Sequence, residues 1–119
     1  MPSLIALLLS LAYSRKDNEN MEYTVNKLGI EVPVIDNKIV ARTATCGNFL
    51  GIGRKQVARF VRENPELFEE DFHYFKVQDG WTISLYLTKE GVNVLLSSHK
   101  NLWFNRALIK AIANYFKEQ

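Results

Sequence analysis

The chain has 119 residues, of which 47% are hydrophobic and 24% charged. These values are ordinary for one globular domain that buries an apolar core, and they exclude a disordered chain, a collagen and a coiled-coil array. The single cysteine, Cys46, excludes an internal disulfide and a cysteine-cluster zinc site, and it favours a reducing, cytoplasmic location. Because His73 and His99 lie too far apart for a local metal motif, we expect neither a metal nor a cofactor.

The net charge is only +2, but the charged residues are segregated along the chain. Residues 38–62 include six basic side chains and no acidic one, whereas residues 63–71 include five acidic side chains and no basic one. Such asymmetry is informative about association rather than about fold, and it predicts a charged partner.

Residues 4–13 are almost entirely apolar and are followed by a polar stretch. Ten helical residues span about 15 Å, half of what a bilayer core requires. The nearest basic residues follow the apolar run, whereas a secretory signal has them first, so a membrane or export role is not favoured. We expect residues 1–20 to form an apolar arm and hinge that packs on this domain or on a second copy, and residues 21–119 to form a single domain. A native start at Met21 is the alternative.

A small β-ribbon is predicted at the start of the domain. Residues 23–25 and 30–35 are β-type runs, and the second alternates apolar and other residues. Pro33 removes one ladder hydrogen bond, which predicts a strand at a sheet edge. The turn signal Asp36-Asn37 then predicts that residues 38–41 return as the partner strand.

Residues 43–62 carry the most specific pattern in the chain. In a frame that starts at Thr43, the fifth residue is Gly47, small enough for the inside of a first helix. The ninth is Gly51, which tolerates the positive φ of a turn. Apolar side chains occupy the inward positions of both predicted helices: Cys46, Leu50, Ile52, Val57 and Phe60. This spacing predicts a helix-turn-helix, in which Cys46 is a small buried hydrophobe.

The same frame turns five residues of the second helix outward: Arg54, Lys55, Ala58, Arg59 and Arg62. Spacings of four and three place Lys55, Arg59 and Arg62 on one stripe, and no acid within the helix offsets their repulsion. A solvated face is the plain alternative. An uncompensated basic stripe is, however, the electrostatic footprint of a helix that binds nucleic acid.

We therefore expect this helix to enter the major groove of DNA. Arg54, Lys55 and Gln56 are predicted near base edges, where arginine suits guanine and glutamine suits adenine. Phosphate contacts are predicted for basic side chains farther from the bases, and hydroxyl or backbone contacts for the start of the first helix. These further residues are Arg42, Arg59, Arg62, Thr43 and Thr45.

A second group of elements is predicted after the basic stretch. Residues 66–71 predict one helical turn, with Leu67 and Phe68 packing inward. Residues 72–77 and 81–87 predict the two strands of a hairpin joined through Asp-Gly, a strong hairpin signal. Lys76, close to the predicted tip, is expected to touch a phosphate.

Two helices are predicted at the end of the chain. Thr88 is a helix cap, with Val92, Leu95 and Leu96 on one face of the helix, and residues 97–101 predict a loop in which His99 caps that helix. Residues 102–119 predict a long amphipathic helix, with Trp103 and Tyr115 completing a core or a dimer seam. Its apolar stripe includes Leu108, Ile109, Ile112 and Phe116. The predicted class is α+β, with a helix-turn-helix core, a winged-helix-like β-ribbon and hairpin, and a long C-terminal helix.

The order of these elements, together with three phrases, resembles a known family. The phrases are RENPELFEEDFHYF at 62–75, LYLTKEG at 85–91 and the aromatic pair Tyr115-Phe116, and the likeness runs from Lys38 to Phe116. The chain resembles the N-terminal DNA-binding domain of phage antirepressors, the ORF-six N-terminal type, which is related to KilA-N and Bro-N domains of large DNA viruses. The resemblance implies a viral or mobile-element protein of transcription regulation. Two features depart from this pattern. The apolar arm is not part of it, and antirepressors usually carry a second, C-terminal domain, which we do not expect in this chain.

Double-stranded DNA and a second copy of the chain are therefore the expected partners, since one short helix buries little surface. The alternative is a protein-interaction module that docks on an acidic partner such as a repressor, without DNA binding. A small nuclease is a third reading, but nucleases gather carboxylates around a metal, and the acids here cluster away from the basic helix. We expect no enzymatic activity and no small-molecule substrate.

Overall fold

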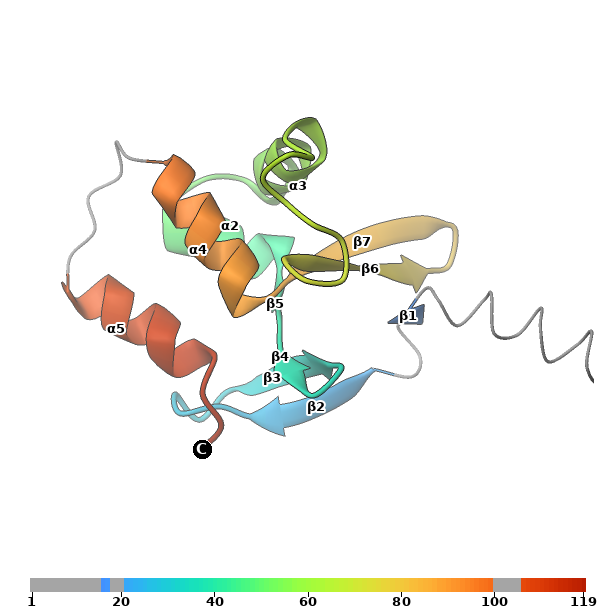
Figure 1. The fold of residues 1–119 in the computed structure, drawn as a ribbon. Coiled ribbons are helices and arrows are strands. Elements are labelled where there is room, and N and C mark those ends of the chain that lie inside the picture. Colours follow the sequence, from blue (N-terminus) through green and yellow to red (C-terminus); the bar gives the residue numbers. More distant parts are fainter. Residues whose placement is uncertain (1–15, 18–20, 100–105) are drawn as a thin grey trace, which may run out of the picture.

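The computed structural model of the protein describes residues 16–17, 21–99 and 106–119. Over these residues the fold is α+β, with four helices and two small, mainly antiparallel sheets (Figure 1). The α+β part of the predicted class is therefore confirmed, whereas the predicted apolar run of the arm lies outside the described residues. In this described part, none of the helices combines the length and apolar character needed to cross a membrane.

The first sheet consists of β2 (Glu22–Val25), β3 (Glu31–Ile35) and β4 (Lys38–Ile39), in that order. The turn between β3 and β4 holds Asp36 and Asn37 at φ values of 51° and 63°, as a type I′ hairpin requires.

The edge position predicted for Pro33 is wrong, because β3 is the central strand of this sheet. Pro33 lies opposite Tyr23 on β2, and its carbonyl accepts a 3.0 Å hydrogen bond from the backbone N–H of Val40. That bond falls just past the end of the short β4. The missing N–H of the proline removes the return bond of this pair, and the Val40 carbonyl accepts a hydrogen bond from the Tyr115 hydroxyl instead.

The second sheet has the order β1-β6-β7-β5. After β4 the chain passes from the first sheet into the second at β5 (Ala41–Arg42). The predicted partner strand 38–41 is therefore divided between the two sheets. Its centre is the hairpin of β6 (Tyr74–Asp79) and β7 (Thr82–Leu87). β1 (Lys16–Asp17) pairs with β6 in parallel, within the segment predicted as a hinge.

The predicted hairpin is confirmed, but its turn lies further along the chain than expected. Asp79 pairs with Thr82, which leaves Gly80 and Trp81 as the two turn residues. The φ of Gly80 is +60°, whereas the φ of Trp81 is not positive. This is the pattern of a type II′ turn, with glycine at its first central position. Lys76 is consequently in the middle of β6, three residue pairs from the turn.

The two helices predicted within 43–62 are confirmed as α2 (Thr43–Leu50) and α3 (Arg54–Glu63). Gly51 ends α2 with a φ of +72°, and Gly47 is buried against the turn. Every predicted inward position packs in the core: Cys46, Leu50 and Val57 are buried, and Ile52 and Phe60 pack against them. Ala58, predicted outward, is half-buried.

The predicted helical turn at 66–71 is wrong: these residues form turns and a single bridge. Phe68 is buried as expected, with its ring 5.8 Å from that of Phe60, but Leu67 is 40% exposed. Pro65 follows the end of α3, so the backbone turns away before a second helix can form.

Helix α4 (Lys89–Ser98) has the predicted caps. The Thr88 hydroxyl accepts a hydrogen bond from the Gly91 N–H at 3.2 Å, and His99 Nδ1 lies 2.8 Å from the Leu95 carbonyl oxygen. The loop after this helix begins at His99, two residues later than predicted. Ser97 and Ser98 belong to the helix, and their hydroxyls donate to carbonyls one turn earlier.

The described part of the last helix, α5, is Arg106–Tyr115, so the length predicted for it is not reached within the described residues. Ile112 and Tyr115 are buried, but Ile109, predicted on the apolar stripe, is 54% exposed. Trp103 lies outside the described residues.

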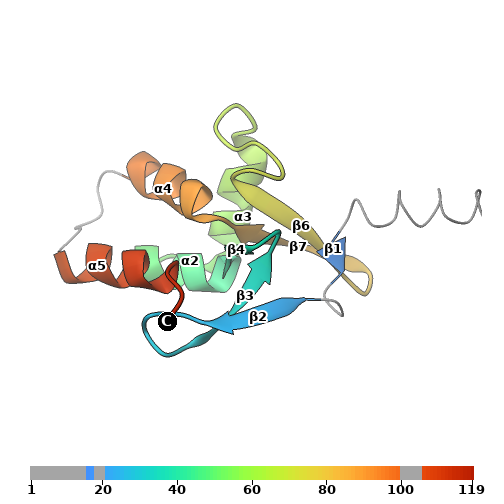
Figure 2. The same cartoon turned by 60° about the horizontal axis from the view of Figure 1, so that its bottom comes forward.

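The chain after α5 is anchored on the β2–β3 turn by the buried Asn26. Its Nδ2 donates to the Tyr115 carbonyl at 3.1 Å, and its Oδ1 accepts from the N–H groups of Leu28 and Ile30 at 3.0 Å each. The Tyr115 hydroxyl in turn donates to the Val40 carbonyl at 3.0 Å. The last residues of the chain are thereby fixed to the first sheet, below α2 in Figure 2.

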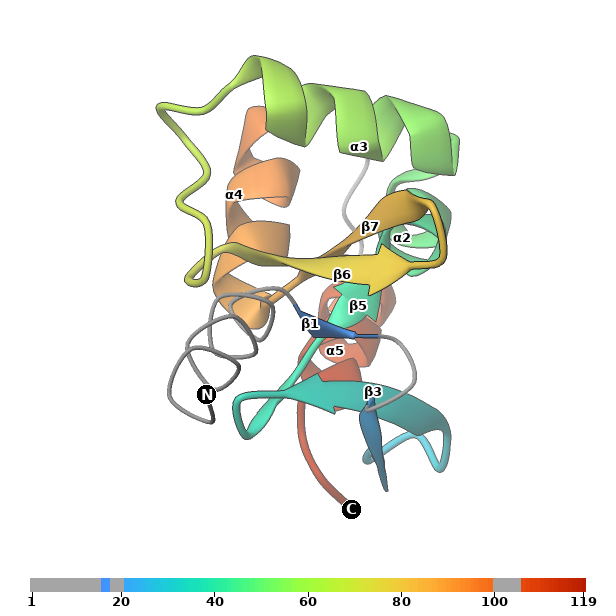
Figure 3. The ribbon, with the colours of Figure 1, turned by 90° about the vertical axis from the view of Figure 1, so that its right-hand side faces the viewer.

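The core has two parts, one on each face of the β6–β7 hairpin. The larger lies between β7 and the helices, and the smaller lies between the hairpin and the first sheet. Figure 3 shows this layering, with α3 and α4 over one side of the hairpin and β3 below it. The smaller cluster consists of Ile35, Val40, Phe75, Val77 and Tyr86, with Met21 packed against it.

Candidate nucleic-acid interface

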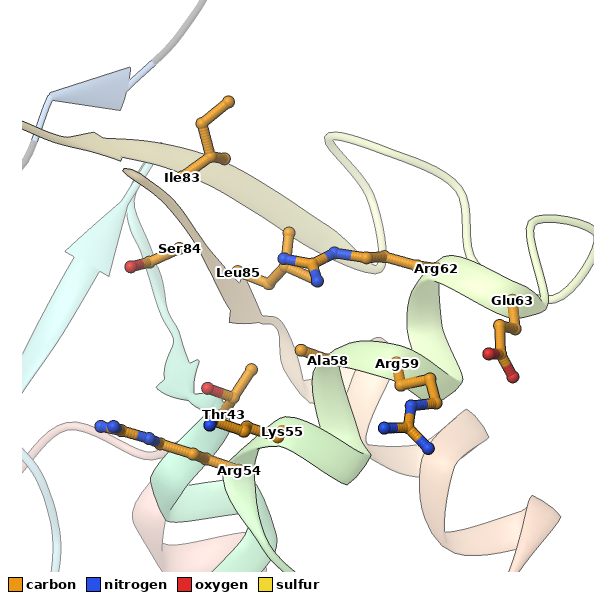
Figure 4. A pocket seen from close by; sticks show the side chains of 10 residues that line it. All are labelled: Thr43, Arg54, Lys55, Ala58, Arg59, Arg62, Glu63, Ile83, Ser84 and Leu85. Carbon is orange, nitrogen blue, oxygen red and sulfur yellow. The ribbon is translucent and has the colours of Figure 1, made fainter. Parts of the chain in front are cut away.

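A groove between α3 and β7 gathers most of the predicted basic residues (Figure 4). One wall is the outward face of α3, and the other is the strand β7. We call it the α3–β7 groove, and it is lined by Thr43, Arg54, Lys55, Ala58, Arg59, Arg62, Glu63, Ile83, Ser84 and Leu85.

The groove has two ends with different side chains. Arg54, Lys55 and Thr43 lie together at the end where α3 begins, while the Arg62 side chain reaches over Leu85 (Figure 4). The groove continues past Arg62 into a second hollow, lined by Val61, Arg62, Tyr74, Lys76, Ile83 and Leu85.

The basic side chains of α3 are exposed and uncompensated. Arg54, Lys55, Arg59 and Arg62 are all exposed, and none of them forms an ion pair within the described residues. Glu63 lines the same groove, yet it too makes no ion pair with them. Four positive charges therefore share one surface with a single unpaired carboxylate, and their combined field attracts an anion that approaches. That carboxylate belongs to Glu63, the last residue of α3, so the prediction that the helix contains no acid is wrong.

The helix dipole adds to this field at one end. α3 begins at Arg54, and the partial positive charge of its first N–H groups lies at the end of the groove that holds Arg54, Lys55 and Thr43. The first turn of α3 contains no acidic residue that would offset it.

Gln56 has a structural role in the described structure. Its Oε1 accepts a 3.0 Å hydrogen bond from the Gly53 N–H, which caps the start of α3. A bidentate contact with adenine uses both the oxygen and the nitrogen of the amide, so the predicted base contact requires this cap to open.

Arg42 and Thr45 lie apart from the groove. They line a separate pocket together with Tyr23, Ile30, Glu31, Val32, Pro33 and Tyr115. The Arg42 Nε donates to the Tyr86 hydroxyl at 3.2 Å, and the guanidinium carbon lies 5.7 Å from the centre of that ring. This hydrogen bond raises the pKa of Arg42 above its ordinary value.

Lys76 is not near the hairpin tip, as the sequence predicts. It lies in the second hollow, and its Nζ stands 3.8 Å from the Glu70 Oε1. Lys76 lies away from the tip because the turn forms at Gly80-Trp81, further along the chain than predicted, which leaves three residue pairs between Lys76 and the turn.

The strand wall of the groove was not predicted from the sequence. Ile83 and Ser84 line it, and Trp81 stands at the adjoining tip. The alternation of apolar and polar residues along 81–87 shows which side chains line the groove only once the turn is placed at Gly80-Trp81. A shift of the strand register would change which side chains face α3.

The chain matches no family model, and neither the curated proteins nor the solved structures returned a match.

Proposed function

We propose that the protein is a DNA-binding module in which α3 is the recognition helix. The observation that carries this proposal is the set of four exposed cations on α3, none of them ion-paired within the described residues. Arg54 and Lys55, at the start of the helix, are the base-reading candidates, and Arg59 and Arg62 hold phosphates.

The tight turn at Gly51 and the packed inner faces of α2 and α3 support a helix-turn-helix of this kind. The β6–β7 hairpin then takes the place of a wing beside the recognition helix. The phrases shared with phage antirepressor domains support a role in the transcription regulation of a virus or mobile element, and a second copy supplies the second half-site.

The salt dependence of binding tests the proposal. If about four phosphates are neutralised per monomer, affinity for a random duplex falls by roughly 150-fold between 50 and 200 mM salt. A dimer with twice the contacts loses on the order of 10⁴-fold over the same range. Fluorescence anisotropy with a labelled duplex measures the slope, and light scattering measures the assembly size. An affinity that hardly changes with salt concentration, or no binding at all, contradicts DNA binding. Docking on an acidic protein then remains as the function of this face.

Single charge removals then assign the contacts. Arg59→Ala weakens binding to all sequences alike and reduces the salt slope by about one, whereas Arg54→Ala also relaxes base preference. Lys110→Ala is the matched control, because Lys110 is an exposed cation on α5 that does not line the groove. Equal losses for Arg59→Ala and Lys110→Ala mean that net charge, and not the groove, attracts the DNA.

A further inference from the structure

The tip of the β6–β7 hairpin holds a tryptophan entirely in solvent. Trp81 is 102% exposed, and the next most exposed large hydrophobic residue in the described part of the chain, Ile109, is 54% exposed. An indole that packs against none of the described residues contributes no burial to their core, although a tryptophan typically buries about 150–250 Å². The stability of the fold therefore does not explain why a tryptophan occupies this position.

The tip is braced so that Trp81 keeps this position. Gln78 Nε2 donates to the Gly80 carbonyl at 2.8 Å, and the Thr82 hydroxyl donates to the Asp79 carbonyl at 2.9 Å. With the type II′ turn, these bonds hold the backbone on both sides of the indole. A side chain carried on a braced turn costs less backbone entropy on binding than one carried on a mobile loop.

The tip adjoins the proposed recognition surface. Trp81 directly precedes β7, whose next residues include Ile83 and Ser84 on the wall of the α3–β7 groove. Figure 3 shows the turn of the β6–β7 hairpin on the side of the molecule where α3 begins, the end of the groove that holds Arg54 and Lys55.

We propose that Trp81 is a DNA-contacting residue of this module, an inference that rests on the proposed function. With α3 in the major groove, the hairpin tip reaches the adjacent minor groove, and the indole inserts at a base step or packs on the sugars there. Apolar side chains act as such wedges in minor-groove binders, and aromatic rings stack on bases of any sequence.

The neighbours of Trp81 favour DNA bases and sugars over a protein surface. Thr82 and Asp79 flank the turn, so the indole does not lie within a broad apolar patch of the kind that forms the core of a protein interface. The Asp79 carboxylate repels phosphates, which directs the contact to bases and sugars instead. Ile83, 37% exposed, extends the apolar surface toward the groove.

Tryptophan emission and affinity together test this inference. In a Trp103→Phe background, Trp81 is the only remaining tryptophan of the two in the chain. We expect its emission to be quenched on addition of a random duplex at 50 mM salt. Trp81→Ala is expected to weaken binding by about 5- to 150-fold, the equivalent of one stacked base, with the salt slope unchanged. Trp81→Phe is expected to retain most of the affinity.

Leu28→Ala is the matched control, since Leu28 is 43% exposed at the β2–β3 turn, away from the groove. Unchanged emission, with Trp81→Ala binding as tightly as the parent, overturns the role of Trp81 and leaves the role of α3 standing. A parent protein that does not bind duplex at all overturns both proposals.

Discussion

Gly47 lies at a position where the packing of α2 against the turn and α3 leaves no room for a side chain, and Gly47→Ala tests that packing. A Cβ at this position lies 2.5 Å from the Ile52 carbonyl oxygen and 3.4 Å from the Arg54 nitrogen. Both are backbone atoms, so no rotamer change relieves the contact, and the start of α3 has to move instead.

The magnitude follows from two opposing effects. Alanine inside a helix is favoured over glycine by about 1 kcal/mol, whereas overpacking costs about 1–3 kcal/mol, and the upper value applies to a clash with backbone. The expected net loss is about 2 kcal/mol. At about 2.1 cal/mol/K of unfolding entropy per residue, each kcal/mol corresponds to about 4 °C for a chain of this size. Gly47→Ala is therefore expected to lower Tm by about 8 °C.

Differential scanning calorimetry provides the measurement, with Asn48→Ala as the control. Asn48 is the next residue of the same helix and is exposed, so alanine there is expected to be neutral or to stabilise by about 0.5 kcal/mol. If Gly47→Ala raises Tm as its helix propensity alone demands, the close approach of the two helices is refuted.

Two further predictions concern buried polar and titratable groups. Asn26→Ala leaves the N–H groups of Leu28 and Ile30 and the Tyr115 carbonyl without their side-chain partner, so a loss of about 3 kcal/mol is expected in urea unfolding; a loss below about 0.5 kcal/mol counts against this anchor. Burial raises the pKa of the Cys46 thiol from 9.0 to about 12, so the unfolded chain releases this proton first and stability falls as pH rises from 9 toward 12. Cys46→Ala is expected to remove about 2 kcal/mol of that fall between pH 9 and 10.5, and equal pH slopes for the two proteins contradict it.

The helix pair was predictable because its constraints are local. Gly47 and Gly51 fix where the first helix packs and where it ends, and the apolar residues at set intervals then leave one inward face for each helix. The prediction for Cys46 succeeded for the same reason. A buried face and a turn that both fall within twenty residues leave few alternative arrangements.

Pairing between strands was less predictable, because it depends on residues far apart in the sequence. Asp79-Gly80 signals a hairpin, but either a turn centred on that dipeptide or one shifted forward satisfies the local preference. The pairing of Asp79 with Thr82 decides between them. Pro33 shows the same limit: its missing N–H is tolerated in a central strand because the Tyr115 hydroxyl donates to the Val40 carbonyl opposite it, a contact that the sequence around Pro33 does not reveal.

The candidate site divides in the same way. Exposure of Arg54, Lys55, Arg59 and Arg62 follows from the helical frame, so the sequence predicts it. The opposite wall of the groove and the separation of Arg42 do not follow, because both depend on where the hairpin packs. Arg42 is drawn to the Tyr86 hydroxyl on β7, the strand that pairs with its own β5.

The distribution of charge along α3 gives the proposed interface a direction. The helix opens with Arg54 and Lys55 at the positive end of its dipole and closes with Glu63 at the negative end. The acidic stretch that follows turns away, and its Glu70 is paired with Lys76 rather than with α3. Attraction for an anion is therefore strongest where α3 begins and weakens toward Glu63. The hairpin tip with Trp81 lies on the side of that same end, so in the proposed complex one approach of a duplex would bring the arginines, the helix terminus and the indole into contact together.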